Sequence, residues 1–274
     1  PFQGTEPSGI TTDSSGMVWF TLPGINSIGS YYEGKFDIQN LTGKISTPVG
    51  IAVDSKGNVW LTQHGPSFIT EFNPQTHYLR TISTSNNSLI QSLPYFCWVD
   101  QSGNVWFNEH QGNAMSEFIP STNSLVEYFI PSRVQSAGNI SYMLTSTLSP
   151  IGQPWYTELF TGKIGTIHAN ASFDESLHLL NYSESNAILT NGSELSYKIA
   201  LSDVASPVYL KGYVGNFTDQ GNFTFKFSPA TGNGSFDSVV SMRNIGARSG
   251  VYFVTITARS ENVAVSRIIE VRVP

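Results

Sequence analysis

Two glutamates and two histidines recur at matched places along the chain, and these residue types can bind a metal and move a proton. Glu109 and Glu158 each lie three residues after a tryptophan, His110 follows the first of them, and His64 holds the same place one repeat earlier. Carboxylate oxygens together with water are ligands that Mg²⁺ accepts, and a neighbouring imidazole can act as a base. The two other positions of this kind hold Leu22 and Gln63.

The tryptophans belong to a phrase that is written four times in the first 170 residues, with spacings of 41, 46 and 49. Its most regular copy is Pro48-Val-Gly-Ile-Ala-Val-Asp-Ser-Lys-Gly-Asn-Val-Trp-Leu-Thr62. This order of apolar run, Asp-x-x-Gly turn and second apolar run predicts a β-hairpin. A second hairpin follows the phrase, and four short strands need about forty residues, which is the size of one propeller blade.

We therefore predict an all-β fold in which residues 1–170 form propeller blades near 7–46, 47–92, 93–139 and 140–170. Trp19, Trp60, Trp106 and Trp155 should pack between blades, because the strand faces around them are apolar on both sides. Four blades are fewer than the six or seven expected of a ring. Further blades before Pro1, blades on another chain, or closure of the four on themselves are the alternatives. An open edge near Pro1 or at 163–168 should pair with a strand of another chain.

The tryptophan phrase stops near residue 171, and about six strands with period-two alternation follow, separated by turns rich in Gly, Asn, Asp and Ser. About 100 residues of this kind predict a β-sandwich of immunoglobulin type over residues 171–274. The phrase Ser249-Gly-Val-Tyr-Phe-Val-Thr-Ile-Thr-Ala258 resembles the closing hairpin of immunoglobulin-like modules in secreted bacterial and archaeal proteins. The resemblance implies a spacer or an adhesive surface.

Charged residues are scarce, at 12% of the chain against a usual share of about 25%. One explanation is an acidic medium, in which carboxylates are protonated and self-repulsion is limited by having few cationic groups. The alternative is that glycans keep the surface wet. Nine Asn-x-Ser/Thr sequons favour a secreted, N-glycosylated protein at the cell surface, and the low charge favours an acidophilic archaeon as its source. The sequons begin at Asn40, Asn86, Asn139, Asn170, Asn181, Asn191, Asn216, Asn222 and Asn233.

Several classes of partner are excluded by composition. The net charge is −6 and there is no basic cluster, so nucleic acid is not an expected partner. No run of 18 apolar residues occurs, so we expect no transmembrane segment in this chain. Cys97 is the single cysteine and lies in an apolar run, which predicts a buried thiol and excludes an intrachain disulfide.

The phrase Pro-x-Gly-Ile-x-x-Asp-x-x-Gly-Asn-Val-Trp-Phe-Thr-Glu is similar to the repeat of the virginiamycin B (streptogramin) lyase family, and more loosely to NHL repeats. The resemblance covers about 165 residues and implies a propeller. For a member with the family's activity it implies opening of a cyclic depsipeptide by elimination. Glu109 and Glu158 would then hold Mg²⁺, with His110 or His64 as the base that removes a proton next to a carbonyl. The alternative is that the carboxylates accept backbone hydrogen bonds and the histidines are turn residues.

Two main functions follow from these patterns, and a sugar-binding propeller or hydrolase subunit is a further alternative, because exposed Tyr and Trp around a funnel would suit carbohydrate. The first is an extracellular module for binding, adhesion or cell-envelope assembly, with protein partners or envelope glycans, and it is supported by the sequons, the appended sandwich and the incomplete glutamate pattern. The second is a Mg²⁺-dependent lyase-like enzyme that opens a cyclic or ester-containing substrate by elimination. It rests on Glu109, His110 and Glu158 alone, so whether the chain is an enzyme, and whether it has a cofactor, stay open.

Overall fold

The computed structural model describes residues 4–84, 91–137, 140–168, 177–180, 187–201, 207–215, 222–261 and 263–274. Over these residues the chain is all β, apart from the short 3-10 helices Pro23–Ile25 and Gln135–Ala137. The predicted fold class is therefore confirmed. No helix among the described residues has the length and apolarity that a membrane crossing requires.

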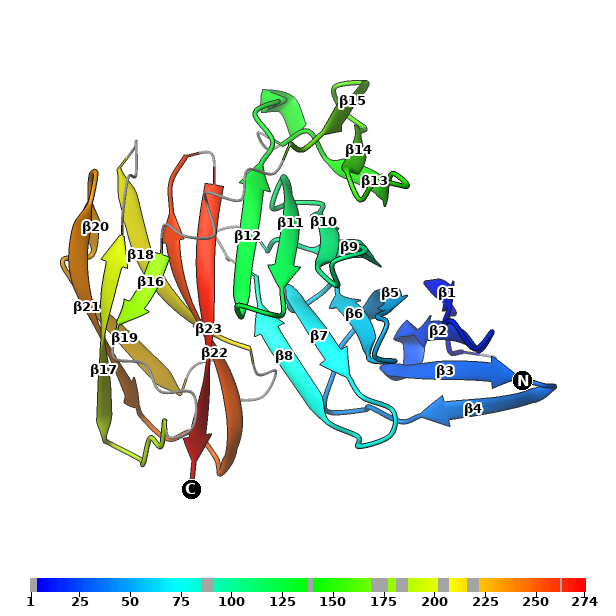
Figure 1. Cartoon of the computed structure of the whole chain (residues 1–274), viewed down its shortest axis with the longest axis horizontal. Helices are drawn as coiled ribbons and strands as arrows, with labels where there is room; N and C mark the ends of the chain where they lie inside the picture. The colour runs from blue at the N-terminus through cyan, green and yellow to red at the C-terminus, as the bar shows by residue number, and fades with distance from the viewer. Residues whose placement is uncertain are drawn as a thin grey trace.

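Four consecutive antiparallel sheets fan out along the first part of the chain and correspond to the four predicted repeats (Figure 1). The first blade contains β1 (Ile10–Thr12), β2 (Val18–Leu22), β3 (Ser27–Tyr32) and β4 (Lys35–Gln39). The second contains β5 (Pro48–Val53), β6 (Val59–Gln63), β7 (Phe68–Phe72) and β8 (Leu79–Ser83). The third contains β9 (Pro94–Val99), β10 (Val105–Glu109), β11 (Ala114–Ile119) and β12 (Ser124–Phe129). The fourth has three described strands, β13 (Met143–Leu148), β14 (Pro154–Glu158) and β15 (Lys163–Thr166).

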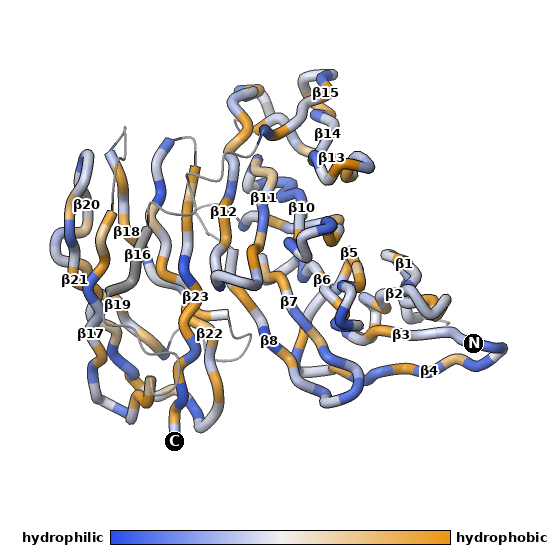
Figure 2. The backbone as a smooth tube through the Cα atoms, in the orientation of Figure 1, coloured by the Kyte–Doolittle hydropathy of each residue, from blue (hydrophilic) through white to orange (hydrophobic). Residues whose placement is uncertain are grey.

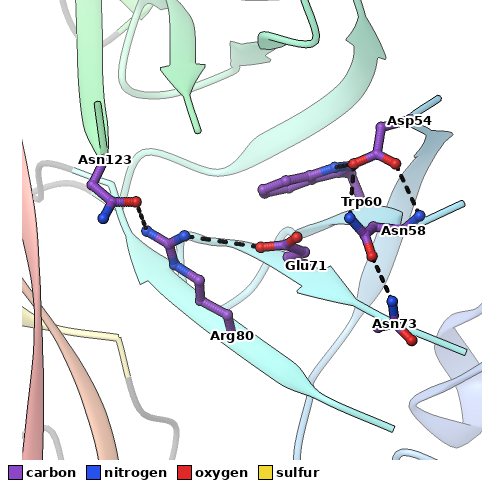
Figure 3. A network of polar contacts seen from close by, with 7 residues as sticks. All are labelled: Asp54, Asn58, Trp60, Glu71, Asn73, Arg80 and Asn123. Carbon is purple, nitrogen blue, oxygen red and sulfur yellow. Dashed lines mark hydrogen bonds and ion pairs between the residues drawn. The ribbon is translucent and has the colours of Figure 1, made fainter. Parts of the chain in front are cut away.

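The repeated Asp-x-x-Gly turn is closed by its own aspartate, which also holds the tryptophan. In the second blade Asp54 Oδ1 accepts from the backbone N–H groups of Lys56 and Asn58, each at 2.9 Å. Its other oxygen accepts from Trp60 Nε1–H at 3.1 Å, and Asn58 extends the network toward Asn73 (Figure 3). The Asp–Trp bond recurs at 3.1 Å in the first and third blades. This bond satisfies the indole N–H of a buried ring, which explains the fixed spacing of aspartate and tryptophan.

A second repeated contact joins each blade to the next. The residue two positions after the tryptophan donates a hydrogen bond to a carbonyl on the first strand of the following blade. These bonds are Thr21 to Val49 O at 2.9 Å, Thr62 to Tyr95 O at 2.5 Å and Asn108 to Met143 O at 3.0 Å. The blades approach so closely that a Cβ at Gly50 would lie 2.3 Å from Tyr95 O. Packing therefore requires glycine at position 50.

The second part of the chain folds into two antiparallel sheets that share one core. One sheet has the order β16-β17-β21-β19, and the other contains β20-β18-β22-β23. Buried apolar side chains from β17, β18, β19, β21, β22 and β23 form a single cluster between them. Hydrophobic positions recur along β22 and β23 (Figure 2). The bounds are β16 Leu177–Leu180, β17 Glu194–Leu201, β18 Val208–Val214, β19 Phe223–Ser228, β20 Thr231–Gly232, β21 Phe236–Asn244, β22 Gly250–Arg259 and β23 Val263–Val273.

The two parts are joined by one continuous sheet. Strand β12, the outermost of the third blade, pairs antiparallel with β23 from Ser124↔Arg267 to Tyr128↔Val263. Two sandwich side chains, Phe253 and Ile268, also enter the core shared by the second and third blades. The sandwich thus covers the outer edge of the third blade by strand addition within the chain.

Arg80 of β8 lies at this junction. Its guanidinium is 5.1 Å from the ring centroid of Phe118 in the third blade and 5.3 Å from that of Phe253 in the sandwich. It also donates to Asn123 Oδ1 at 2.8 Å and lies 3.9 Å from Glu71 (Figure 3). Because one side chain contacts two blades and the sandwich, it links their positions.

Candidate functional site

The residue three positions after each tryptophan is the last of its blade's second strand, and its side chain is buried in all four blades. This burial explains why an apolar leucine occupies the position in the first blade. Gln63, in the second blade, accepts from the backbone N–H of Ser46 at 2.7 Å and donates to Thr70 at 2.6 Å. At this position, therefore, the side chain points into the protein, and the polar Gln63 finds its hydrogen-bond partners there.

Glu109 makes its contacts within its own blade. Its Oε1 accepts from the Ser116 hydroxyl of β11 at 2.7 Å, and its carboxyl is hydrogen-bonded to that of Glu127 on β12. Burial, and then the neighbouring Glu127 carboxylate, raise the pKa of Glu109 well above its usual value of 4.5. The two buried carboxyls therefore favour a state in which they share a proton.

Glu158 makes a separate contact, in which its Oε2 accepts a hydrogen bond from the Thr161 hydroxyl at 2.5 Å. The described residues contain no group of three or more His, Cys, Asp or Glu side chains that could hold a metal ion. Mg²⁺ prefers six oxygen ligands in near-octahedral geometry, and a carboxyl that shares a proton with another carboxyl is a poor metal ligand. The oxygen ligands found in the described part of the chain do not fit a Mg²⁺ site.

The two predicted histidines lie together. The ring centroids of His64 and His110 are 5.4 Å apart, at the ends of neighbouring blades. His64 Nδ1 lies 3.2 Å from Pro94 O, and His110 Nε2 lies 3.4 Å from Leu144 O. The contact with Leu144 O is a hydrogen bond only when Nε2 carries the proton, and this tautomer leaves the lone pair on His110 Nδ1. That nitrogen is buried and has no hydrogen-bond partner among the described residues.

Aromatic rings surround His110. Tyr95 stacks on its imidazole with centroids 4.2 Å apart, Tyr142 lies 4.7 Å away, and Phe160 lies 5.3 Å from Tyr142. We call these residues with the two histidines the aromatic cluster: His64, Tyr95, His110, Tyr142 and Phe160. The cluster brings together the second, third and fourth blades at the ends where their second strands finish.

The electrostatic character of the aromatic cluster is neutral. Burial, and then the proximity of His64, lower the pKa of His110 from 6.5 to about 4. Burial also lowers the pKa of His64. Both imidazoles are therefore uncharged near pH 7. Such a site can accept a hydrogen bond or take a proton at His110 Nδ1, and it offers ring faces around that atom.

Sequence patterns pointed to the histidines and missed the tyrosines. Tyr95 and Tyr142 each follow the opening residue of their phrase, so an aromatic residue at that place in two consecutive repeats was the available signal.

Of the nine sequons, Asn40, Asn191 and Asn233 are exposed and Asn222 is half-buried. The other five, Asn86, Asn139, Asn170, Asn181 and Asn216, lie outside the described residues.

The chain is similar in structure to known propellers, although no protein-family model and no curated protein matches its sequence. Selenomethionine-substituted virginiamycin B lyase from Staphylococcus aureus has 18% identity and a TM-score of 0.50, over 98% of this chain and 85% of the enzyme. A catalytically inactive histidine-to-alanine variant of that enzyme with quinupristin has 19% identity, the same TM-score and the same coverage. A streptogramin B lyase has 17% identity and a TM-score of 0.50, over 99% of this chain and 84% of that chain. The structural similarity shows a shared propeller fold, and at identities below 20% it shows the fold alone.

Proposed function

We propose that the chain is a secreted binding module whose aromatic cluster holds a neutral, ring-shaped ligand, such as a sugar ring of an envelope glycan. One observation carries the proposal: a buried acceptor nitrogen, His110 Nδ1, belongs to an imidazole surrounded by aromatic faces and has no hydrogen-bond partner in the described part of the chain. Leaving such an atom unpaired costs about 1–3 kcal/mol. A ligand hydroxyl that donates to it would recover this energy.

The neutrality of the cluster limits the class of ligand. A charged ligand would need a counter-charge, and the lowered pKa values of both histidines remove their positive charge near neutral pH. Binding pockets of this kind combine apolar and aromatic walls with a few placed polar groups. A sugar supplies both partners, because its C–H face packs on an aromatic ring while its hydroxyls donate.

Exposed rings give the ligand a surface to pack on, whereas His110 is 3% exposed, so its Nδ1 would meet a ligand hydroxyl only after side-chain movement. Phe160 is exposed, and Tyr142 and Tyr95 are half-buried. A ligand that packs on Phe160 and Tyr142 would cover apolar surface, each 100 Å² of which contributes about 2.5 kcal/mol. The buried glutamates take no direct part, because their hydrogen bonds are made inside their own blades.

We propose further that the C-terminal sandwich is of immunoglobulin type and acts as a spacer or adhesive surface. The sheet orders β16-β17-β21-β19 and β20-β18-β22-β23 support this, because they match the arrangement of strands A-B-E-D opposite C-F-G, with β20 as an added edge strand. Tyr252, near the start of β22, donates from its hydroxyl to Arg248 O at 2.8 Å. A tyrosine with this bond at the start of strand F is a hallmark of the fold.

A lyase-like elimination is the second candidate, and His110 is the reason to retain it. A neutral imidazole with an unpaired nitrogen can act as a general base. In the reaction, Nδ1 would take the proton from the carbon next to a carbonyl, the electron pair would form a C=C bond, and the C–O bond to the ester oxygen would break. In virginiamycin B lyase a histidine-to-alanine variant is catalytically inactive.

The test is calorimetric titration of the chain with neutral trisaccharides built from glucose, mannose or N-acetylglucosamine, at pH 7. We expect millimolar or tighter binding to one of them, at least about fivefold weaker binding by Phe160→Ala, and unchanged binding by Tyr209→Ala, which removes a somewhat more exposed ring from the sandwich. Equal binding by the wild type and Phe160→Ala, or no binding to any of the sugars, would contradict the proposal. Conversion of a cyclic depsipeptide into a linear product that carries a free carboxylate and a new C=C bond, abolished by His110→Ala, would support the lyase instead.

A further inference from the structure

The faces between blades follow a positional rule. In the second blade, Trp60 and Ile69 point toward the third blade and are 1% and 0% exposed. We call the face that carries these two positions the forward face. Ile51 and Phe72 of the same blade pack against the first blade and are 6% and 1% exposed. We call the face that carries those two positions the rear face.

Both end blades leave the matching face uncovered. In the fourth blade the forward positions are Trp155 and Ile164, which are 41% and 74% exposed. In the first blade the rear positions are Ile10 and Tyr31, which are 71% and 37% exposed. The same positions that bury apolar side chains between inner blades therefore present them to solvent at the two ends of the fan, which amounts to two apolar patches.

The hydrogen bond that joins neighbouring blades is also incomplete at the two ends of the fan. Thr157 stands two residues after Trp155 and is the counterpart of Thr62. Among the described residues its hydroxyl finds no carbonyl of a following blade and lies 3.4 Å from Thr145 O of its own blade. In the first blade the counterpart of the accepting residues Val49 and Tyr95 is Ser8. The fourth blade thus carries a donor, and the first blade an acceptor, of the bond that joins inner blades.

We propose that the forward face of the fourth blade docks on the rear face of the first blade in a second copy of this chain, so that two copies close head to tail into a ring of eight blades. The two open faces repeat the two sides of the interfaces already formed between blades one and two and between blades two and three. Eight blades lie within the range of about 4–8 found in propellers.

The position of the sandwich allows this contact. It lies against the outer strands β8 and β12 of the two middle blades, and the two open faces lie at the far ends of the fan (Figure 1). The contact joins different surfaces of each copy, so it is heterologous, and two such contacts related by a twofold axis close the ring. The open ends predicted from the sequence would then be covered face to face by a blade, in place of strand pairing at an edge.

Light scattering coupled to size-exclusion chromatography tests the proposal with the full chain. The wild type should have twice the 30.0 kDa mass of one chain. Ile164→Asp should weaken association by about tenfold or more, because a carboxylate would be buried in the contact. Ile245→Asp, which changes an exposed isoleucine of the sandwich, should leave the mass unchanged. Circular dichroism should show that both variants fold.

A mixing experiment tests the head-to-tail geometry. Ile10→Asp spoils only the rear face and Ile164→Asp only the forward face, so the two variants together retain one intact contact and should form a mixed dimer that neither forms alone. A disulfide between Ser8→Cys and Thr157→Cys should link copies covalently under oxidising conditions. A monomeric wild type at 100 μM, a filament in place of a dimer, or dimers that survive both Asp substitutions would overturn the proposal.

Discussion

Replacing Glu109 by glutamine should change how the stability of the chain depends on pH. Glu109 and Glu127 are both buried and are hydrogen-bonded to each other. Burial and the second carboxylate raise the pKa of Glu109 in the folded chain above its unfolded value of 4.5. Between those two pH values the folded chain binds a proton that the unfolded chain lacks.

The sign and size of this pH dependence follow from the linkage between proton binding and folding. A group whose folded-state pKa is raised contributes its full stability below pH 4.5 and loses it as the pH rises to the folded-state pKa. One proton changes the free energy of unfolding by about 1.4 kcal/mol per pH unit over that window. In Glu109→Gln the amide can still accept from Ser116 and can donate to the Glu127 carboxylate, so the shared proton is no longer needed.

The assay is urea unfolding of the wild type and the variant at half-unit steps from pH 4 to pH 8. The difference between their free energies of unfolding should move in favour of the variant by about 1.4 kcal/mol per unit above pH 4.5. Glu158→Gln is the matched control, since it alters the buried glutamate of the next blade, which accepts from Thr161. A constant difference between wild type and Glu109→Gln across this range would refute the shared proton.

Three further outcomes are expected. The pKa of His110 is lowered to about 4, so wild-type stability gains from this residue as the pH rises from about 4 to its unfolded value of 6.5, and His110→Gln should remove that gain in the same unfolding series. Asp54→Ala frees two turn N–H groups and the indole N–H of Trp60 and should cost about 2–3 kcal/mol of stability, whereas Asp237→Ala on an exposed site should cost under about 0.5 kcal/mol. If few cations limit self-repulsion in acid, near-UV circular dichroism should show a folded chain at about pH 3, and loss of that signal there would remove the acid-adaptation hypothesis.

The positions of the two glutamates illustrate how far sequence reasoning reaches. Their equivalence within the repeat was correct, because both end the second strand of a blade. Their chemistry depends on partners that the repeat does not specify. Glu109 meets Glu127, which is eighteen residues away and adjacent because β10, β11 and β12 pair in register. The carboxyl pair therefore follows from the register of three strands in one blade, which the tryptophan phrase does not specify.

By itself the sequence determined the local units. The period of the tryptophan phrase, the Asp-x-x-Gly turns and the alternating apolar residues specify hairpins and blades, since each depends on contacts within about forty residues. The tertiary structure alone decided how those units meet. The pairing of β12 with β23 joins residues more than a hundred positions apart, and the aromatic cluster gathers side chains from three blades. A strand edge or a ring face accepts many partners, so only the packing of the whole chain selects one.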